Sequence, residues 1–97
     1  MSEHAQIVQL TRMRPVPGRR EDLLGRLHEQ AEAMRSLPGL YGAQVCEVQE
    51  DPSELVLISR WRDEDAMRGL ATGATQRALE ATNELVEHED IQHLVSA

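Results

Sequence analysis

The sequence predicts an α+β fold of the ferredoxin-like type, in which a split β-α-β-β-α-β chain order builds an antiparallel sheet. Two patterns lead to this prediction. Some segments alternate between apolar and polar residues, which is typical of strands with one buried face. Others place apolar residues three or four apart, as amphipathic helices do. At 97 residues the chain has the length of one such domain, covering residues 1–97.

The first strand is predicted at residues 5–14, where polar and apolar side chains alternate. Its two faces carry different sets: Ile7, Gln9, Thr11 and Met13 on one, and Val8, Leu10, Arg12 and Arg14 on the other. The prolines and glycine of residues 15–18 end this strand, because proline cannot continue the hydrogen-bond ladder.

The first helix is predicted at residues 19–36, about five turns long. Its apolar face carries Leu23, Leu24, Leu27, Ala31 and Met34. Pro38-Gly39 ends this helix, because the residue before a proline is pushed out of the helical region.

Residues 40–49 and 54–62 are predicted to pair as a hairpin, with the turn-forming residues 50–53 between them. Asp63 follows the second of these strands and can cap a helix.

The second helical region contains a break or kink at Thr72-Gly73 and continues through residues 74–85. The short, mixed segment at residues 90–96 is predicted to form the last strand.

Two helices cover one face of such a sheet and leave the other face bare. The apolar strand residues are too many for two helices to hide: Val8, Leu10, Val45, Val48, Val56 and Ile58. A second sheet packed on the bare face would cover them, so we expect a homodimer.

Charge and composition exclude several classes of protein. The formal net charge of −7 argues against a nucleic-acid binder. The longest apolar run, Leu55–Ile58, is far too short to span a membrane, and the N-terminus lacks an apolar signal-peptide core. Together with the single Cys46, which has no partner for an intrachain disulfide, these features lead us to expect a cytoplasmic protein.

Several short motifs lie in or beside the predicted elements. They are Pro17-Gly18-Arg19, Pro38-Gly39-Leu40, Glu50-Asp51-Pro52, and Leu55–Trp61 followed by Asp63-Glu64-Asp65-Ala66. This pattern, which covers nearly the whole chain, resembles the antibiotic biosynthesis monooxygenase (ABM) family. The resemblance implies a dimeric α+β barrel with a ligand pocket in each protomer between sheet and helices. Several members oxidise aromatic polyketides or quinols with molecular oxygen and without metal, flavin or haem, so the resemblance implies no cofactor.

The haem-degrading relatives carry an Asn in the first strand, a Trp closing the third and a His on the following helix. This sequence matches only the Trp, at Trp61, and its single asparagine is Asn83. Polyketide-oxidising members use Trp, Asn, Tyr and Arg around the pocket. Trp61 matches again, whereas Leu57 stands where that Asn would be and Tyr41 lies on a different element. We therefore rank haem degradation below oxidation of an aromatic substrate.

Three residues are the candidates for catalysis. Trp61 would line the pocket and stack on a planar substrate, or simply anchor the end of its strand to a helix, and both can hold. His28, on the margin of the first helix's apolar face, is the best candidate for a general base, although a helix-edge His more often faces solvent. Arg12 could hold a phenolate or belong to a solvated basic corner.

The predicted substrate-binding residues are Trp61, Tyr41, Leu27 and Met34. His88 and His93 lie five apart on or near the last strand, so alternation places them on opposite faces and they cannot form a facing metal pair. We expect no bound metal.

Two functions follow as hypotheses. The first is a cofactor-independent monooxygenase that oxidises a small phenolic, quinol or polyketide-type aromatic with O2. The second is a dimeric ligand-binding or accessory barrel without catalysis, favoured by the scarcity of aromatic residues, which are one Trp, one Tyr and no Phe.

Overall fold

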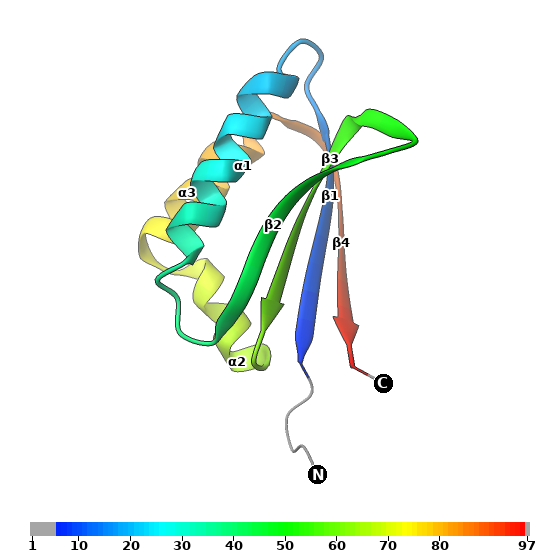
Figure 1. Cartoon of the computed structure of the whole chain (residues 1–97). Helices are drawn as coiled ribbons and strands as arrows, with labels where there is room; N and C mark the ends of the chain where they lie inside the picture. Colours follow the sequence, from blue (N-terminus) through cyan, green and yellow to red (C-terminus); the bar gives the residue numbers. More distant parts are fainter. Residues whose placement is uncertain (1–5, 97) are drawn as a thin grey trace.

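Four strands form one antiparallel sheet in the order β2-β3-β1-β4 (Figure 1). A computed structural model describes residues 6–96 of the chain, without the side chains of Ala71 and Ala74. The strands are β1 (Ile7–Pro15), β2 (Leu40–Val48), β3 (Asp51–Trp61) and β4 (Val86–Val95). With the helices between them they give the predicted ferredoxin-like β-α-β-β-α-β order. Ala5, the first residue of the predicted strand, lies outside the described residues.

All the helices lie on one face of this sheet (Figure 1). They are α1 (Arg20–Met34), α2 (Glu64–Met67), the 3-10 helix η1 (Arg68–Ala71) and α3 (Gly73–Asn83). Helix α1 packs against α3 and against β2. Between helices and sheet lies the core, whose largest fully buried side chains include Trp61, Leu23, Leu27, Met34 and Leu55. No helix of the described residues is long and apolar enough to cross a membrane.

The predicted cap and break in the second helical region are confirmed. The Asp63 carboxylate accepts a hydrogen bond from the Ala66 backbone N–H, 2.9 Å away, and so satisfies one free donor at the start of α2. Thr72 has an extended backbone, and Gly73 follows with a φ of +54°. These two residues therefore separate η1 from α3 instead of kinking one continuous helix.

Two predicted strand boundaries were wrong. Strand β3 begins at Asp51, and the hairpin turn is at Gln49 and Glu50, so Pro52 belongs to the strand. Proline is tolerated there because it lies near the end of the ladder. Strand β4 begins at Val86 and not at residue 90, because it pairs with the whole length of β1. Because both faces of this part of β4 are exposed, polar residues occupy both of them. The sequence there lacks the alternation of apolar and polar residues that indicates a strand.

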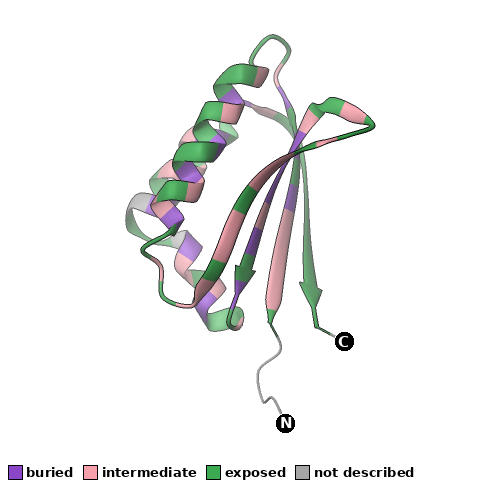
Figure 2. Ribbon diagram, in the orientation of Figure 1, coloured by how far each residue is buried: buried purple, intermediate pink, exposed green. Residues whose placement is uncertain are grey.

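The two faces of the sheet are covered differently. On the face away from the helices lie Val8, Leu10 and Ile58, which are half-buried, and Leu94, which is exposed, as the sequence predicts for a face that no helix covers. Val56 lies on the same face but is already buried within the single chain. Val45, expected to be among them, instead lies opposite Leu57 and packs on the helix-side core. Strand β4 is exposed along almost its whole length (Figure 2).

Candidate functional site

A cavity of about 330 Å³ lies between the helix-facing side of the sheet and the helices η1 and α3. Its apolar walls come from Met13, Leu57, Leu70, Leu79 and Ile91. The volume is at the lower end of the range for ligand pockets, about 300 to 1,000 Å³, and suits a molecule of one or two rings. Because Ile91 of β4 is 51% exposed and still lines the cavity, the cavity opens along the β4 edge of the sheet.

The sheet side of this cavity follows from the strand register. Leu57, Thr11 and Ile91 lie side by side across β3, β1 and β4, and all three line the cavity. The next pair toward the hairpin end is Met13 with Glu89, whose carboxylate is exposed at the rim. The sheet-side wall is therefore apolar at Met13, Leu57 and Ile91, and its polar groups are the Thr11 hydroxyl, the Gln9 amide and, at the rim, the Glu89 carboxylate.

The inner end of the cavity is formed by buried polar residues from two helices. Gln30 of α1 and Thr82 of α3 are both buried and line the cavity. The Thr82 hydroxyl donates to Gln30 Oε1 over 2.9 Å, which links the two helices inside the core. A buried polar link of this kind holds the two side chains next to each other inside the core.

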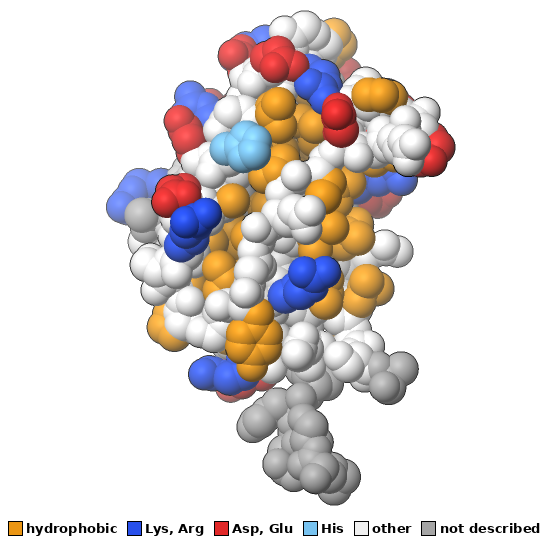
Figure 3. Space-filling view, viewed as in Figure 1, with side chains coloured by type: hydrophobic (Ala, Val, Ile, Leu, Met, Phe, Trp, Pro, Cys, Tyr) orange, Lys and Arg blue, Asp and Glu red, His pale blue; other side chains and the backbone are white. Residues whose placement is uncertain are grey.

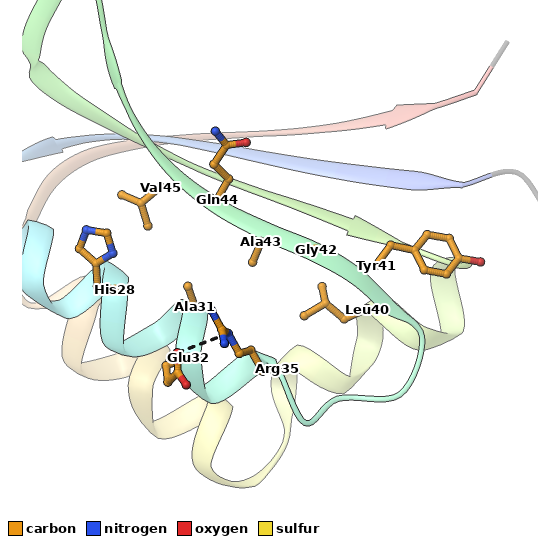
Figure 4. A pocket seen from close by; sticks show the side chains of 10 residues that line it. All are labelled: His28, Ala31, Glu32, Arg35, Leu40, Tyr41, Gly42, Ala43, Gln44 and Val45. Carbon is orange, nitrogen blue, oxygen red and sulfur yellow. Dashed lines mark ion pairs between the residues drawn. The ribbon is translucent and has the colours of Figure 1, made fainter.

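A second hollow, a groove of about 560 Å³, runs between α1 and the edge strand β2. Hydrophobic side chains gather in this part of the surface (Figure 3). In the close-up, Ala31, Ala43 and Val45 face the groove, whereas the ring of Tyr41 points away from it (Figure 4). The Glu32–Arg35 ion pair lies at its side.

Two of the predicted polar site residues line the groove, at its opposite ends (Figure 4). His28 is exposed on α1 and lines the groove with Tyr41, which is 59% exposed. Tyr41 lies in a register shift between Leu40 and Gly42, where β2 loses its regular pairing with β3. Neither residue lines the cavity.

The other predicted residues lie elsewhere. Trp61 is completely buried, and its indole Nε1 donates to the Ser59 hydroxyl over 2.9 Å. With Leu27 and Met34 it belongs to the same hydrophobic cluster as the cavity residues Met13 and Leu57. These three side chains are thus part of the core and do not line the cavity.

Arg12 lies on the opposite face of the sheet and donates a hydrogen bond to the Glu54 carboxylate. Arg14 bonds the other oxygen of that carboxylate, leaving the Glu54 side chain only 12% exposed. The hydrogen bond from Arg12 is the main reason that the pKa of Glu54 is lowered. Hydrogen bonding from the Ser53 hydroxyl likewise lowers the pKa of nearby Asp51.

The polar cavity residues that sequence reasoning missed include Gln30, Thr82, Thr11 and Glu89. Gln30 continues the buried stripe of α1, which runs Leu23, Leu27, Gln30, Met34. A lone amide on an apolar helical stripe is a recognisable signal, because burying it has a free-energy cost unless it is bonded. Among residues 6–96, no three His, Cys, Asp or Glu side chains are grouped so that they could hold a metal ion.

The geometry can be set beside known proteins. Rv0793 from Mycobacterium tuberculosis is 20% identical, with a TM-score of 0.85 and 95% of each chain covered. PA3566 from Pseudomonas aeruginosa is 19% identical, with a TM-score of 0.84 over 100% of this chain and 99% of that one. A protein from Chloroflexus aurantiacus, provisionally named an antibiotic biosynthesis monooxygenase, is 22% identical, with a TM-score of 0.80 over 95% and 93%.

At these identities the likeness shows the fold alone. No curated protein matches the chain. The model of one family, described as antibiotic biosynthesis monooxygenase, matches residues 6–82, which is most of the chain. The chain therefore belongs to the antibiotic biosynthesis monooxygenase family.

Proposed function

We propose that the protein is a cofactor-independent monooxygenase that oxidises a small phenol, quinol or anthrone-type aromatic with O2 in the cavity between sheet and helices. The observation that carries this proposal is the cavity's combination of apolar walls with buried polar groups at its inner end, in a chain of this family. Such a site can exclude water from a reactive anion and still bind the oxygen atom that carries its charge.

The reaction needs no external reductant, because the substrate supplies the electrons. Removing a proton from the methylene carbon of an anthrone gives an anion that can transfer electrons to O2. One oxygen atom replaces the two methylene hydrogens and forms the new carbonyl group, and the other leaves as water. The protein must supply a base, an apolar chamber and a hydrogen-bond partner for the substrate oxygen.

In this proposal Glu89 is the base, because it is the carboxylate that lines the cavity. His28, the base favoured by the sequence pattern, lies in the groove beside β2. Trp61 acts by packing, since its indole is buried in the hydrophobic core and bonded to Ser59. Arg12 is engaged with Glu54 on the other face of the sheet.

The test is oxygen consumption by purified protein with anthrones, hydroquinones and naphthols, measured above the autoxidation rate. Incorporation of label from ¹⁸O2 into the product would identify a monooxygenase. A Leu79→Trp variant fills the cavity and should lower the uptake, whereas Val45→Trp fills the groove and should not. If Val45→Trp lowered the uptake and Leu79→Trp did not, the reaction site would be the groove lined by His28 and Tyr41. No uptake with any substrate would contradict the proposal.

A second function, ligand binding without turnover, is favoured by one observation. Among the residues described as lining the cavity there is no aromatic side chain, and the charged side chains of Arg68 and Glu89 are exposed at its rim. Arg68 is also engaged in ion pairs with Glu64 and Asp65. Saturable binding of a naphthol in the absence of any oxygen uptake would favour this alternative.

A further inference from the structure

Gln30 is a polar side chain in an otherwise apolar position. It is only 3% exposed, on the face of α1 that packs into the core, and it lines the cavity. Its amide has one oxygen acceptor and two N–H donors, and the described chain supplies it with a single side-chain partner, Thr82. One end of a buried amide is therefore left without a partner.

The unpartnered end faces the cavity. Throughout the described residues, every side-chain nitrogen or oxygen atom that is fully shielded has a hydrogen-bond partner. The free end of the Gln30 amide has none, so it retains accessible surface. Because Gln30 is otherwise enclosed and lines this cavity, that surface lies in the cavity.

The hydroxyl of Thr82 decides which end of the amide is free. Its oxygen lies 2.9 Å from Gln30 Oε1 and 2.8 Å from the Ala78 carbonyl oxygen, but a hydroxyl has one proton and donates to one of them at a time. When Thr82 donates to Gln30, the amide N–H groups face the cavity as donors. When Thr82 donates to Ala78, the amide can turn over, donate to the Thr82 oxygen and present its own oxygen as an acceptor.

Thr11 provides a second group of the same kind. It is 7% exposed on β1, between Leu57 and Ile91, and lines the cavity. Its hydroxyl has no hydrogen-bond partner among residues 6–96, so by the same reasoning it retains surface there. A hydroxyl also donates or accepts as required. Two adaptable polar groups thus face one apolar chamber.

We propose that Gln30 and Thr11 form a subsite that binds the oxygen substituent of a one- or two-ring aromatic ligand, with Thr82 as the residue that positions Gln30. The subsite accepts a hydrogen bond from a ring hydroxyl and donates one to a ring carbonyl. It therefore binds a phenol and the corresponding ketone or quinone equally well. A ligand without that oxygen leaves both groups unpaired in an apolar site, which disfavours its binding. This inference rests on the cavity of the proposed function but concerns binding, not turnover.

The test compares the binding of 2-naphthol, 1,4-naphthoquinone and naphthalene to the wild-type protein without oxygen, by equilibrium dialysis. We expect both oxygenated ligands to bind more tightly than naphthalene. Gln30→Met keeps the side-chain volume, and Thr82 retains its bond to the Ala78 carbonyl, so the variant should fold. It should lower the preference for each oxygenated ligand by about tenfold, while the affinity for naphthalene stays the same or rises.

Two further variants complete the test. Thr11→Val has nearly the shape of threonine without its hydroxyl and should also reduce the preference, which keeps the test valid if Gln30→Met fails to fold. Gln76→Met is the matched control, because Gln76 is exposed on α3 and lines neither the cavity nor the groove, and it should change nothing.

A wild-type protein without preference for the oxygenated ligands, or an unchanged preference in both Gln30→Met and Thr11→Val, would overturn the inference. Selective binding without oxygen uptake would contradict the oxygenase proposal and leave the subsite standing. Oxygen uptake with an unchanged binding preference in both variants would overturn the subsite and leave the oxygenase proposal standing. The two failures are therefore distinguishable.

Discussion

Glu89 and His28 are acid-base side chains that line the cavity and the groove respectively. If the cavity is the reaction site, Glu89→Gln should lower kcat for oxygen consumption by at least about tenfold, because a general base contributes that much or more. His28→Gln is the matched control and should retain the wild-type rate. Loss of activity in His28→Gln alone would restore the base assignment that the sequence pattern favours.

Glu54 should make stability depend on pH. Its folded-state pKa is lowered, chiefly by the hydrogen bond from Arg12, so its stabilising contribution is present above its unfolded pKa, about 4.3, and is lost as pH falls through the lower folded value. Glu54→Gln should therefore lower Tm at pH 7 but have progressively less effect below about pH 4.

Thermal unfolding from pH 7 to pH 2 measures this dependence. Glu80→Gln, at an exposed position of α3, is the control, and its Tm difference from wild type should stay near zero throughout. A Glu54→Gln deficit of equal size at pH 7 and pH 2 would show that the ion pairs with Arg12 and Arg14 do not stabilise the fold.

The connection between α1 and β2 depends on Gly39. Its φ is +82°, and a Cβ built there would lie 2.6 Å from the Cβ of buried Ala66, so a side chain is both strained and crowded. Its carbonyl also accepts a hydrogen bond from the Arg62 N–H over 2.8 Å, which ties the end of β3 to this turn. Gly39→Ala should reduce the free energy of unfolding by about 2 kcal/mol or more, measured by urea denaturation.

Gly25 offers the matched glycine. It lies inside α1, and a Cβ there would have no neighbour within 4 Å. Gly25→Ala should therefore stabilise the protein by about 0.5 to 1 kcal/mol, since glycine costs that much inside a helix. A Gly39→Ala variant as stable as the wild type would contradict the close contact between this turn and Ala66 of α2.

The whole molecule has one face of its sheet covered by helices and one bare, and the bare face includes Leu10 and Ile58 at its centre. We predict a homodimer in which two such faces pack together. Light scattering at micromolar concentration should give about twice the chain mass of 10.9 kDa. Ile58→Arg should shift the protein to monomer, because an unpaired charge would be buried in the interface.

Gln76→Arg is the control for this experiment, because Gln76 is exposed on α3, away from the bare face. It should leave the mass unchanged. A wild-type protein with the mass of one chain would contradict the dimer and with it the face-to-face barrel.

Local patterns were enough to predict the elements, their order and most of the faces. The alternation that puts Met13 inward and Arg14 outward, the cap at Asp63 and the break at Thr72-Gly73 all follow from a few neighbouring residues, and the structure has each of them. These features depend on backbone geometry and side-chain period, which are properties of short segments.

Long-range pairing controlled the rest. Strand β4 starts at Val86 because β1 supplies partners that far, and Tyr41 turns outward because the β2–β3 register shifts beside it. Gln30, Thr11 and Thr82 come from α1, β1 and α3, so only the packed fold brings them to one cavity. The sequence alone determined which segments are strands and helices. The convergence of side chains into a site depended on contacts between residues far apart in the chain.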